Sequence, residues 1–446
     1  MERQQPALDN PERKKLKPGG LLSILGPGLI TGASDDDPSG IATYSQAGAQ
    51  FGFARSWVML FSWPLMCAIQ EIGARIGRIT GRGIAGNIKQ HYPAPVLFGL
   101  VGLLVIANTI NLGADIGAMA AALKLLMGGP VLVYVALFAV GSLLLEIFVD
   151  YARYVSILKW LTISLFAYVA VALVVHVPWG QVAHDLFIPK LTADKAYLTV
   201  VVAILGTTIS PYLFFWQAEE EVEEVKEREG AKPLERAPSQ ARSEFKRIRI
   251  DTILGMGLSN AVALFIIVST AATLHAKGIT DIQTSAQAAE ALRPIAGKFV
   301  FFVFGLGIIG TGLLAVPVLA GSAAFALGEA FGWHVGLSRK PERAKLFYAT
   351  IAVATILGSL INFTPIDPMK ALFWSAVLNG VVAVPVMIMM MMLSSNSAAM
   401  GHFRLPPILK SIGWLSVVAM AQQQSECLRL GSVKIWRRWA MGVRAS

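Results

Sequence analysis

Charged residues are scarce in this sequence of 446 residues. Asp, Glu, Lys and Arg make up 15% of it, whereas soluble globular domains carry about a quarter. Hydrophobic residues make up 55%, and the mean hydropathy is +0.59. This balance excludes a soluble main body and predicts an all-α polytopic membrane protein. The net charge of +10 is expected to reflect loop topology, because no basic, aromatic-rich soluble domain is present to bind nucleic acid.

Cysteine and histidine are also rare, with two and six residues. Cys67 and Cys427 define neither a disulfide framework nor a zinc site. No histidine lies close to a candidate nucleophile, and no His-Glu-x-x-His motif is present. The chain is therefore expected not to be an enzyme and to hold no cofactor.

Long apolar runs dominate the sequence. Runs of about 20 residues are long enough to cross a bilayer as helices. About eleven occur, at roughly 21-50, 55-77, 97-127, 130-149, 155-177, 196-217, 250-274, 299-331, 344-363, 369-393 and, poorly, 406-421. Lys and Arg collect in alternate loops, which predicts a multi-pass protein of the cell (inner) membrane with a cytoplasmic N-terminus. The charged stretch 218-250 is expected to be a solvated helical extension and cytoplasmic linker.

Three consecutive carboxylates interrupt the first apolar run, in Asp35-Asp36-Asp37-Pro38-Ser39-Gly40. Carboxylates at bilayer depth need a water-filled cavity, a partner or a cation. Pro38 removes a backbone donor, and the Ser-Gly pair after it has weak helix propensity. We therefore expect a helix broken in its middle, whose free carbonyls bind a cation, rather than a surface loop with Asp caps.

A second run contains a proline, in Gly206-Thr207-Thr208-Ile209-Ser210-Pro211-Tyr212. Pro211 is expected to leave a carbonyl near Thr207 without its usual partner. The two interrupted spans lie five spans apart, so they correspond in two five-span halves that are inverted relative to each other. Such paired breaks mark an ion or substrate site at the membrane midplane. The predicted domains are a tail (1-20), a first inverted repeat (21-177), a second (178-395), and a poor final span with a basic tail (396-446).

Several motifs, taken in order, resemble the NRAMP divalent-metal transporters. They are Gly26-Pro27-Gly28, Asp37-Pro38-Ser39-Gly40 and Gln46-Ala47-Gly48-Ala49, then Arg75, Gly77, Thr80 and Gly81, then Trp179-Gly180 with Leu186-Phe187-Ile188-Pro189, then Ile209-Ser210-Pro211, and finally His275 to Leu292. The resemblance covers roughly residues 20 to 395. It implies a LeuT-like fold, with discontinuous first and sixth helices, that imports metal by alternating access.

The sequence departs from the family at both breaks. The family's Asp-Pro-Gly-Asn reads Asp37-Pro38-Ser39-Gly40 here, and its Met-Pro-His-Asn reads Ser210-Pro211-Tyr212-Leu213. The soft thioether, which favours transition metals, is therefore absent. The expected ligands are oxygen-only, with room for retained waters, which suits Mg²⁺ and also Mn²⁺. They are Asp37, Gly40, Thr207 and Ser210, and this set resembles the NRAMP-related magnesium transporters.

Four accessory residues are predicted: Asp36, Asn111, Asp115 and Asn379. Asp115 is a carboxylate within a span, where it would take a proton or pair with a neighbour. The family's acidic pair on its third helix corresponds to Asn111 and Ala114, which leaves proton coupling open. Asn379-Gly380 offers an oxygen, a helix break or core packing. Asp35 and Asp36 offer an outer cation-attracting step or local capping.

Three functions fit this pattern. The first is a secondary transporter of Mg²⁺ and/or Mn²⁺, with the metal ion and the lipid bilayer as partners. The second is a proton-coupled Mn²⁺/Fe²⁺ NRAMP importer, which adds protons as partners. The third is a LeuT-fold sodium-coupled amino-acid symporter, which the acidic first break disfavours, since helix-end dipoles at an amino-acid site face a carboxylate.

Overall fold

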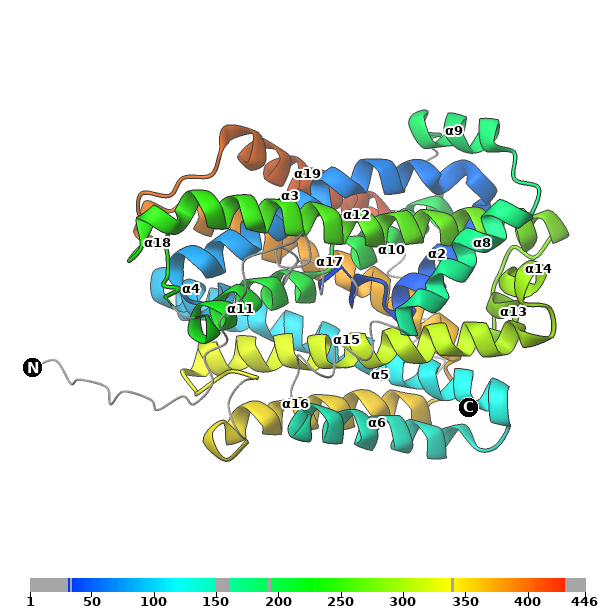
Figure 1. The fold of residues 1–446 in the computed structure, drawn as a ribbon, viewed down its shortest axis with the longest axis horizontal. Coiled ribbons are helices and arrows are strands. Elements are labelled where there is room, and N and C mark those ends of the chain that lie inside the picture. Colours follow the sequence, from blue (N-terminus) through cyan, green and yellow to red (C-terminus); the bar gives the residue numbers. More distant parts are fainter. Residues whose placement is uncertain are drawn as a thin grey trace, which may run out of the picture.

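The computed structural model describes residues 31–32, 34–149, 161–190, 194–228, 230–337 and 341–429. Within these ranges the chain is nearly all helical and contains no strand, which confirms the predicted all-α class. Many of the long helices run along the long axis of the molecule (Figure 1). The Gly26-Pro27-Gly28 motif, the N-terminal tail and the basic tail after residue 429 lie outside the described residues.

The helices are α2 (Pro38–Phe51), α3 (Ser56–Thr80), α4 (Ile84–His91), α5 (Ala94–Met127), α6 (Val131–Phe148), α8 (Phe166–Val174), α9 (Trp179–Phe187), α10 (Lys195–Thr208), α11 (Pro211–Glu227), α12 (Ala241–Thr273), α13 (Ser285–Ala289), α14 (Arg293–Ala296), α15 (Val300–Phe331), α16 (Lys345–Ser359), α17 (Pro368–Ser395), α18 (Ser397–Met400) and α19 (Pro407–Arg429). Short 3₁₀ turns connect several of them, including η2 (Gly52–Arg55) between α2 and α3.

Eight helical stretches of the described chain are long and apolar enough to cross a membrane. The number is nine if the bent pair Ile163–Val174 and Trp179–Phe187 forms one span. The sequence predicts about eleven. The lower number has three sources. The count joins α2 and α3 into one stretch, Pro38–Thr80, although they run in opposite directions along α12, since Asp35 and Ala49 on one side contact Ser259 and His275 while Met59 on the other contacts Asn260. The expected spans 21-50 and 155-177 also lie partly outside the described residues, and α19 is not among the qualifying helices. The division into two inverted repeats stays a prediction.

Burial separates the central helices from the lipid-facing ones. The most apolar part of the α10–α11 stretch is 94% buried, whereas that of α6 is 17% buried. Figure 1 shows α6 and α16 along one edge of the bundle, with α2, α10 and α17 in its middle. A span that neighbours cover on all sides can carry polar groups that lipid would not tolerate. The helices that carry the predicted breaks are therefore central ones.

Glycines bring these central helices close together. A Cβ atom added at Gly206 on α10 would lie 2.0 Å from the backbone oxygen of Ala376 on α17. One added at Gly77 on α3 would lie 2.1 Å from the backbone oxygen of Ala218 on α11. Small residues at such positions allow backbones to approach within membranes, where van der Waals packing drives helix association.

The stretch 218–250 contains the end of α11, a linker at 228–240 that is mostly exposed or half-buried where it is described, and the start of α12. The prediction of a helical extension that is solvated is wrong for the first part of this stretch. Glu219 and Glu221 on α11 are 1% and 0% exposed. Arg247 on α12 pairs with Glu221 at 2.5 Å and with Glu224 at 3.1 Å. The carboxylates are buried because α11 packs against neighbouring helices that supply cations and backbone donors, which the local sequence does not reveal.

Candidate metal site

The first predicted break lies between Asp35 and Pro38. Ser34 and Asp35 are helical, Asp36 and Asp37 are not, and α2 begins at Pro38. Asp37 is the N-cap of α2: its Oδ1 accepts hydrogen bonds from the Ser39 hydroxyl and the Gly40 N–H, both at 2.7 Å. Proline suits the first helical position, because the N–H that it lacks would have no partner there. Local capping chemistry therefore restarts the helix at Pro38.

The second break separates α10 from α11. α10 ends at Thr208, Ile209 and Ser210 are not helical, and Pro211 starts α11. The Ser210 hydroxyl lies 2.7 Å from the Gly206 carbonyl oxygen and 2.8 Å from that of Thr207. The expectation of an unpartnered carbonyl near Thr207 is thus wrong, because Ser210 caps it. A carbonyl oxygen has two lone pairs, so one remains for a cation.

The two breaks face each other in the core. The Tyr212 hydroxyl on α11 lies 3.4 Å from Asp37 Oδ2 and 3.4 Å from the Ser34 carbonyl oxygen. On the other side, a Cβ atom added at Gly40 would lie 3.1 Å from the Thr207 hydroxyl oxygen. Asp37 is 1% exposed. The structure therefore places the buried Asp37 carboxylate where the two interrupted helices meet.

Asn111 on α5 links Asp37 to a third helix. Its Nδ2 donates to Asp37 Oδ2 at 3.2 Å, and its Oδ1 accepts from the Ser375 hydroxyl of α17 at 2.7 Å. All three residues are buried. The chain Ser375–Asn111–Asp37 therefore orients the carboxylate, as outer hydrogen-bond partners orient metal ligands in known sites.

Replacing Asn111 by alanine is expected to raise the KM for the transported metal by about 10- to 100-fold, the range observed when such outer partners are lost. The matched control is Asn108→Ala on the same helix. Its amide is also buried, but it donates to Ser322 on α15 at 2.8 Å instead of to Asp37. Initial uptake rates against metal concentration in proteoliposomes measure the effect. Equal KM values for the two variants would contradict the role of Asn111.

Asp115 lies one helical turn from Asn111 on α5. It is 0% exposed, and neither of its oxygens has a hydrogen-bond partner within the described residues. Its carboxyl group interacts electrostatically with that of Asp37. A buried carboxyl without a partner calls for a proton or a cation. Asp115 therefore belongs to the same electrostatic unit as Asp37.

The other accessory residues have different surroundings. Asn379 is buried on α17, and within the described chain its side-chain amide has no hydrogen-bond partner. The option of a helix break there is wrong, because α17 is continuous from Pro368 to Ser395. Asp35 and Asp36 are buried against α12, where the Ser259 hydroxyl lies 2.6 Å and 3.1 Å from their respective carboxylates. They lie in the interior rather than on an outer surface.

The donor set that faces the second break is oxygen-rich, and Asp37 is its carboxylate. In the part of the chain that the structure describes, no group of three or more His, Cys, Asp or Glu side chains could hold a metal ion. Asp37 is the carboxylate at the meeting point, and hydroxyl and carbonyl oxygens of Thr207 and Ser210 lie on the facing break. Such a set leaves coordination positions for water, which Mg²⁺ keeps readily. Metal binding by these residues stays a prediction.

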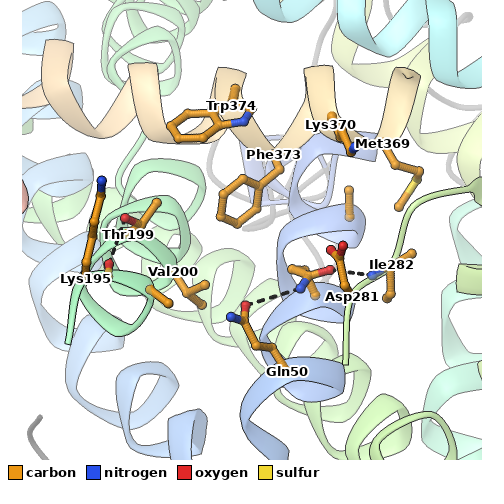
Figure 2. A pocket seen from close by; sticks show the side chains of 13 residues that line it. Gln50, Lys195, Thr199, Val200, Asp281, Ile282, Met369, Lys370, Phe373 and Trp374 are labelled. Atoms are coloured by element: carbon orange, nitrogen blue, oxygen red, sulfur yellow. Dashed lines mark hydrogen bonds between the residues drawn. The ribbon is translucent and has the colours of Figure 1, made fainter. Parts of the chain in front are cut away.

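A cavity of about 340 Å³ opens next to the site, between α2, α10 and α17. Figure 2 shows Lys195 and Thr199 on α10 facing Phe373 and Trp374 on α17 across it. Its wall includes Ala42, which is two residues, or about 3 Å of helix rise, beyond Gly40. The cavity therefore lies beside α2 near the first break, although Asp37, Thr207 and Ser210 are not among the residues that line it.

The loop after α12 borders this cavity and is tied to α2. Gln46 on α2 accepts a hydrogen bond from the Ile282 N–H at 2.9 Å and donates to the Thr280 carbonyl at 3.2 Å. Figure 2 shows Ile282 and Asp281 on this loop beside the cavity. The side-chain amide of Gln46 thus holds the loop at the edge of the cavity.

Sequence reasoning missed three residues that contact the carboxylates. In the sequence, Tyr212 stands only in the place of the family's histidine, and no motif indicates Ser259 or Ser375. Each is a serine or tyrosine within an apolar span. Such residues are common in membrane helices, so their presence alone does not indicate a binding site. Their contacts span 175 to 264 residues of sequence. Only the Pro211-Tyr212 order could have indicated a hydroxyl at the second break.

The fold and the site define a helical multi-pass membrane protein with two interrupted spans that meet at a buried carboxylate. Residues 28–425 match the family described as Natural resistance-associated macrophage protein-like. Because the match covers most of the chain, this protein belongs to that family, NRAMP.

Known transporters resemble this chain in sequence and in structure. The divalent metal cation transporter MntH of Klebsiella pneumoniae is 27% identical over 418 residues, which are 92% of this chain and 95% of that protein. A mutant of the Eremococcus coleocola manganese transporter is 18% identical, has a TM-score of 0.75 and covers 97% of this chain and 94% of its own. Mhp1, of the nucleobase-cation-symport-1 family, is 12% identical, with a TM-score of 0.53 and coverages of 91% and 93%. The structural likenesses confirm the LeuT-like fold.

The prediction that the chain is not an enzyme is confirmed, since its relatives are membrane transporters. The narrower assignment to a magnesium-transporting branch is not decided by these likenesses.

Proposed function

We propose that this protein is a secondary transporter that moves divalent metal cations, Mg²⁺ and/or Mn²⁺, across the cell membrane by alternating access. The observation that carries the proposal is the buried Asp37 carboxylate, held where the breaks of two central helices meet. A doubly charged ion would offset the buried negative charge of Asp37. The names of the relatives, a divalent metal cation transporter and a manganese transporter, support this substrate class.

The chemistry of the donors favours a hard ion. Asp37, Thr207, Ser210 and the backbone near Gly40 supply oxygen, and no thioether stands at the start of α11. Oxygen ligands and retained waters suit Mg²⁺ and Mn²⁺, whereas thioethers select softer metals. On this basis we place the protein closest to the NRAMP-related magnesium transporters.

The two ends of the bundle differ in a way that supports alternating access. The cavity between α2, α10 and α17 is lined by the start of α10 and the start of α17. At the other end, Arg247 on α12 pairs with Glu221 and Glu224 on α11, while Arg78 on α3 pairs with Glu244 on α12 at 3.5 Å. We infer that this end faces the cytoplasm, because cytoplasmic loops collect Lys and Arg, and Arg78, Arg228 and Arg247 lie there. Asp37 is 1% exposed, so the site itself is closed to solvent in this structure, and opening toward either side requires helix movement.

Purified protein in liposomes tests the proposal. We expect saturable uptake of Mg²⁺, followed with a trapped indicator, and competition by Mn²⁺ added outside. Absence of uptake for both ions would refute the proposal. Sodium-dependent uptake of a labelled amino acid in the same vesicles would instead support the symporter alternative.

A proton-coupled Mn²⁺/Fe²⁺ importer is the second candidate. The observation that favours it is Asp115, a buried carboxyl without a hydrogen-bond partner in the described chain that interacts electrostatically with Asp37. Acidification of the vesicle lumen driven by an inward metal gradient would support this candidate. A metal flux that leaves the lumenal pH unchanged would favour uncoupled Mg²⁺ and Mn²⁺ transport.

Ser210→Met is expected to change metal preference, because it introduces a soft ligand at the second break. We expect Mg²⁺ uptake to fall by about tenfold or more, equivalent to about 1.4 kcal/mol, while uptake of a softer metal such as Cd²⁺ increases relative to Mg²⁺. Ser210→Ala is the control, since it removes the same hydroxyl without adding a thioether. Parallel uptake assays with both metals measure the ratio. An identical Cd²⁺ to Mg²⁺ ratio in the two variants would place Ser210 outside the coordination sphere.

A further inference from the structure

A second pair of acidic residues lies away from the metal site. Glu219 on α11 is seven residues past Tyr212, or about 10 Å along the helix. Its partner is Glu329, near the end of α15. Glu219 is 1% exposed, and neither of its oxygens has an N–H or hydroxyl partner within the described residues. A buried carboxyl in this situation needs another means of stabilisation.

Glu329 lies at the N-terminus of α4. Its Oε1 accepts from the Gly83 N–H and its Oε2 from the Gly86 N–H, both at 2.7 Å. Two backbone donors and the helix dipole stabilise a negative charge at this position. Of the two carboxyl groups, that of Glu329 is therefore the one whose negative charge the structure stabilises.

The two carboxyl groups converge on one glycine. A Cβ atom added at Gly83 would lie 1.7 Å from Glu219 Oε1 and 2.6 Å from Glu329 Oε2. These two distances place oxygens of the two carboxyl groups next to each other in the buried interior. Two ionised carboxylates that share a buried site repel each other, so the pair favours holding one proton. Because the backbone donors hold the charge on Glu329, the proton belongs to Glu219.

The charged neighbours have partners of their own. On α11, Lys226 pairs with Glu223 at 2.7 Å, although it also acts on the acidic pair at longer range. On α4, the Lys89 amine donates to the backbone oxygen of Glu329 at 3.3 Å. On α3, Arg78 pairs with Glu244 of α12. Each of these cations has another contact, so a proton on Glu219 remains the direct neutraliser of the pair.

We propose that Glu219 and Glu329 form a proton-binding site that holds the cytoplasmic end of α11 against α4 and α15, and that release of this proton opens that end. The inference rests on the alternating-access function proposed above. When Glu219 Oε loses its proton to cytoplasmic water, two adjacent carboxylates repel each other and favour separation of α11 from α15. Because α11 begins at Pro211 and Tyr212, its displacement alters the contact between Tyr212 and Asp37.

Infrared spectroscopy of the full-length protein in lipid tests the proton directly. In wild type we expect a protonated-carboxyl carbonyl band that disappears as the pH is raised. Glu219→Gln should lose this component, because an amide can donate to Glu329 but does not titrate. Glu290→Gln, in the exposed pair with Arg293, is the control and should keep it. An unchanged titrating band in Glu219→Gln would overturn the proposal.

Transport supplies the second readout. With the pH varied only at the cytoplasmic face, wild-type metal uptake should increase toward alkaline pH, and Glu219→Gln should lose this dependence. Glu219→Asp keeps a titratable group and should retain it. A pH response in Glu219→Gln equal to that of wild type would refute the opening step. If neither the wild-type protein nor any variant transports metal, the proposed function is refuted. The infrared comparison would still show whether Glu219 and Glu329 bind a proton.

Discussion

Asp37→Asn is expected to abolish divalent-metal uptake while leaving the protein folded. The Asp37 carboxylate is the charged ligand at the meeting point of the two breaks, and its replacement by a neutral amide removes the main attraction for a cation. Asparagine caps helices as well as aspartate does, so the hydrogen bonds from Ser39 and Gly40 can persist. Uptake of Mg²⁺ and Mn²⁺ should therefore fall to the level of protein-free vesicles.

The comparison with Asp37→Ala separates charge from capping. Alanine removes the N-cap as well, which destabilises a helix by about 1 kcal/mol. We expect Asp37→Ala to be inactive and less stable, and Asp37→Asn to be inactive at near wild-type stability. Isothermal titration measures the metal affinity of the two variants, and thermal unfolding of the same preparations measures their stability. Substantial uptake by Asp37→Asn would show that this carboxylate is not a metal ligand.

Gly206→Ala is expected to destabilise the protein and to reduce transport, although it adds only one methyl group. The new Cβ would lie 2.0 Å from the backbone oxygen of Ala376 and 2.5 Å from the backbone nitrogen of Gly380. Backbone atoms cannot rotate away as a side chain can, so α10 must move from α17. Overpacking of this kind costs about 1–3 kcal/mol, and occasionally more. The movement also displaces Thr207, the next residue.

Gly99→Ala is the matched control for Gly206→Ala. Gly99 also lies inside a long helix, α5, but a Cβ added there meets no atom within 4 Å. Alanine at such a position should leave stability unchanged or raise it slightly, because glycine weakens a helix interior. Thermal unfolding followed by size-exclusion chromatography compares the two variants. Equal unfolding temperatures would mean that α10 and α17 adapt without strain.

The helix breaks were predictable because their causes are local. Pro38 and Pro211 each lack an N–H, and the Asp37 side chain caps the next turn. A few neighbouring residues therefore cause both interruptions. The apolar spans were predictable for a similar reason, since the bilayer sets their length. The boundary between the first two spans was predictable as well, since α2 and α3 reverse direction at η2, where Gly52 has a positive φ of 60°.

The charged stretch after Ala218 shows where local reasoning fails. A run of five glutamates reads as a solvated helix face, yet Glu219 and Glu221 are buried. Glu219 lies beside Glu329 and Gly83, and Glu221 pairs with Arg247. These partners lie on α15, α4 and α12, and no spacing within the run indicates them.

The sequence by itself determined the membrane class, the two interrupted helices, the family resemblance and the oxygen character of the candidate ligands. These properties follow from composition and short-range backbone chemistry. Only the tertiary structure decided that Asn111, Tyr212 and Ser375 surround Asp37, and that two glutamates meet at the start of α4. The physical reason is that such contacts join residues far apart in the chain, and packing of the helices, rather than any local preference, brings them together.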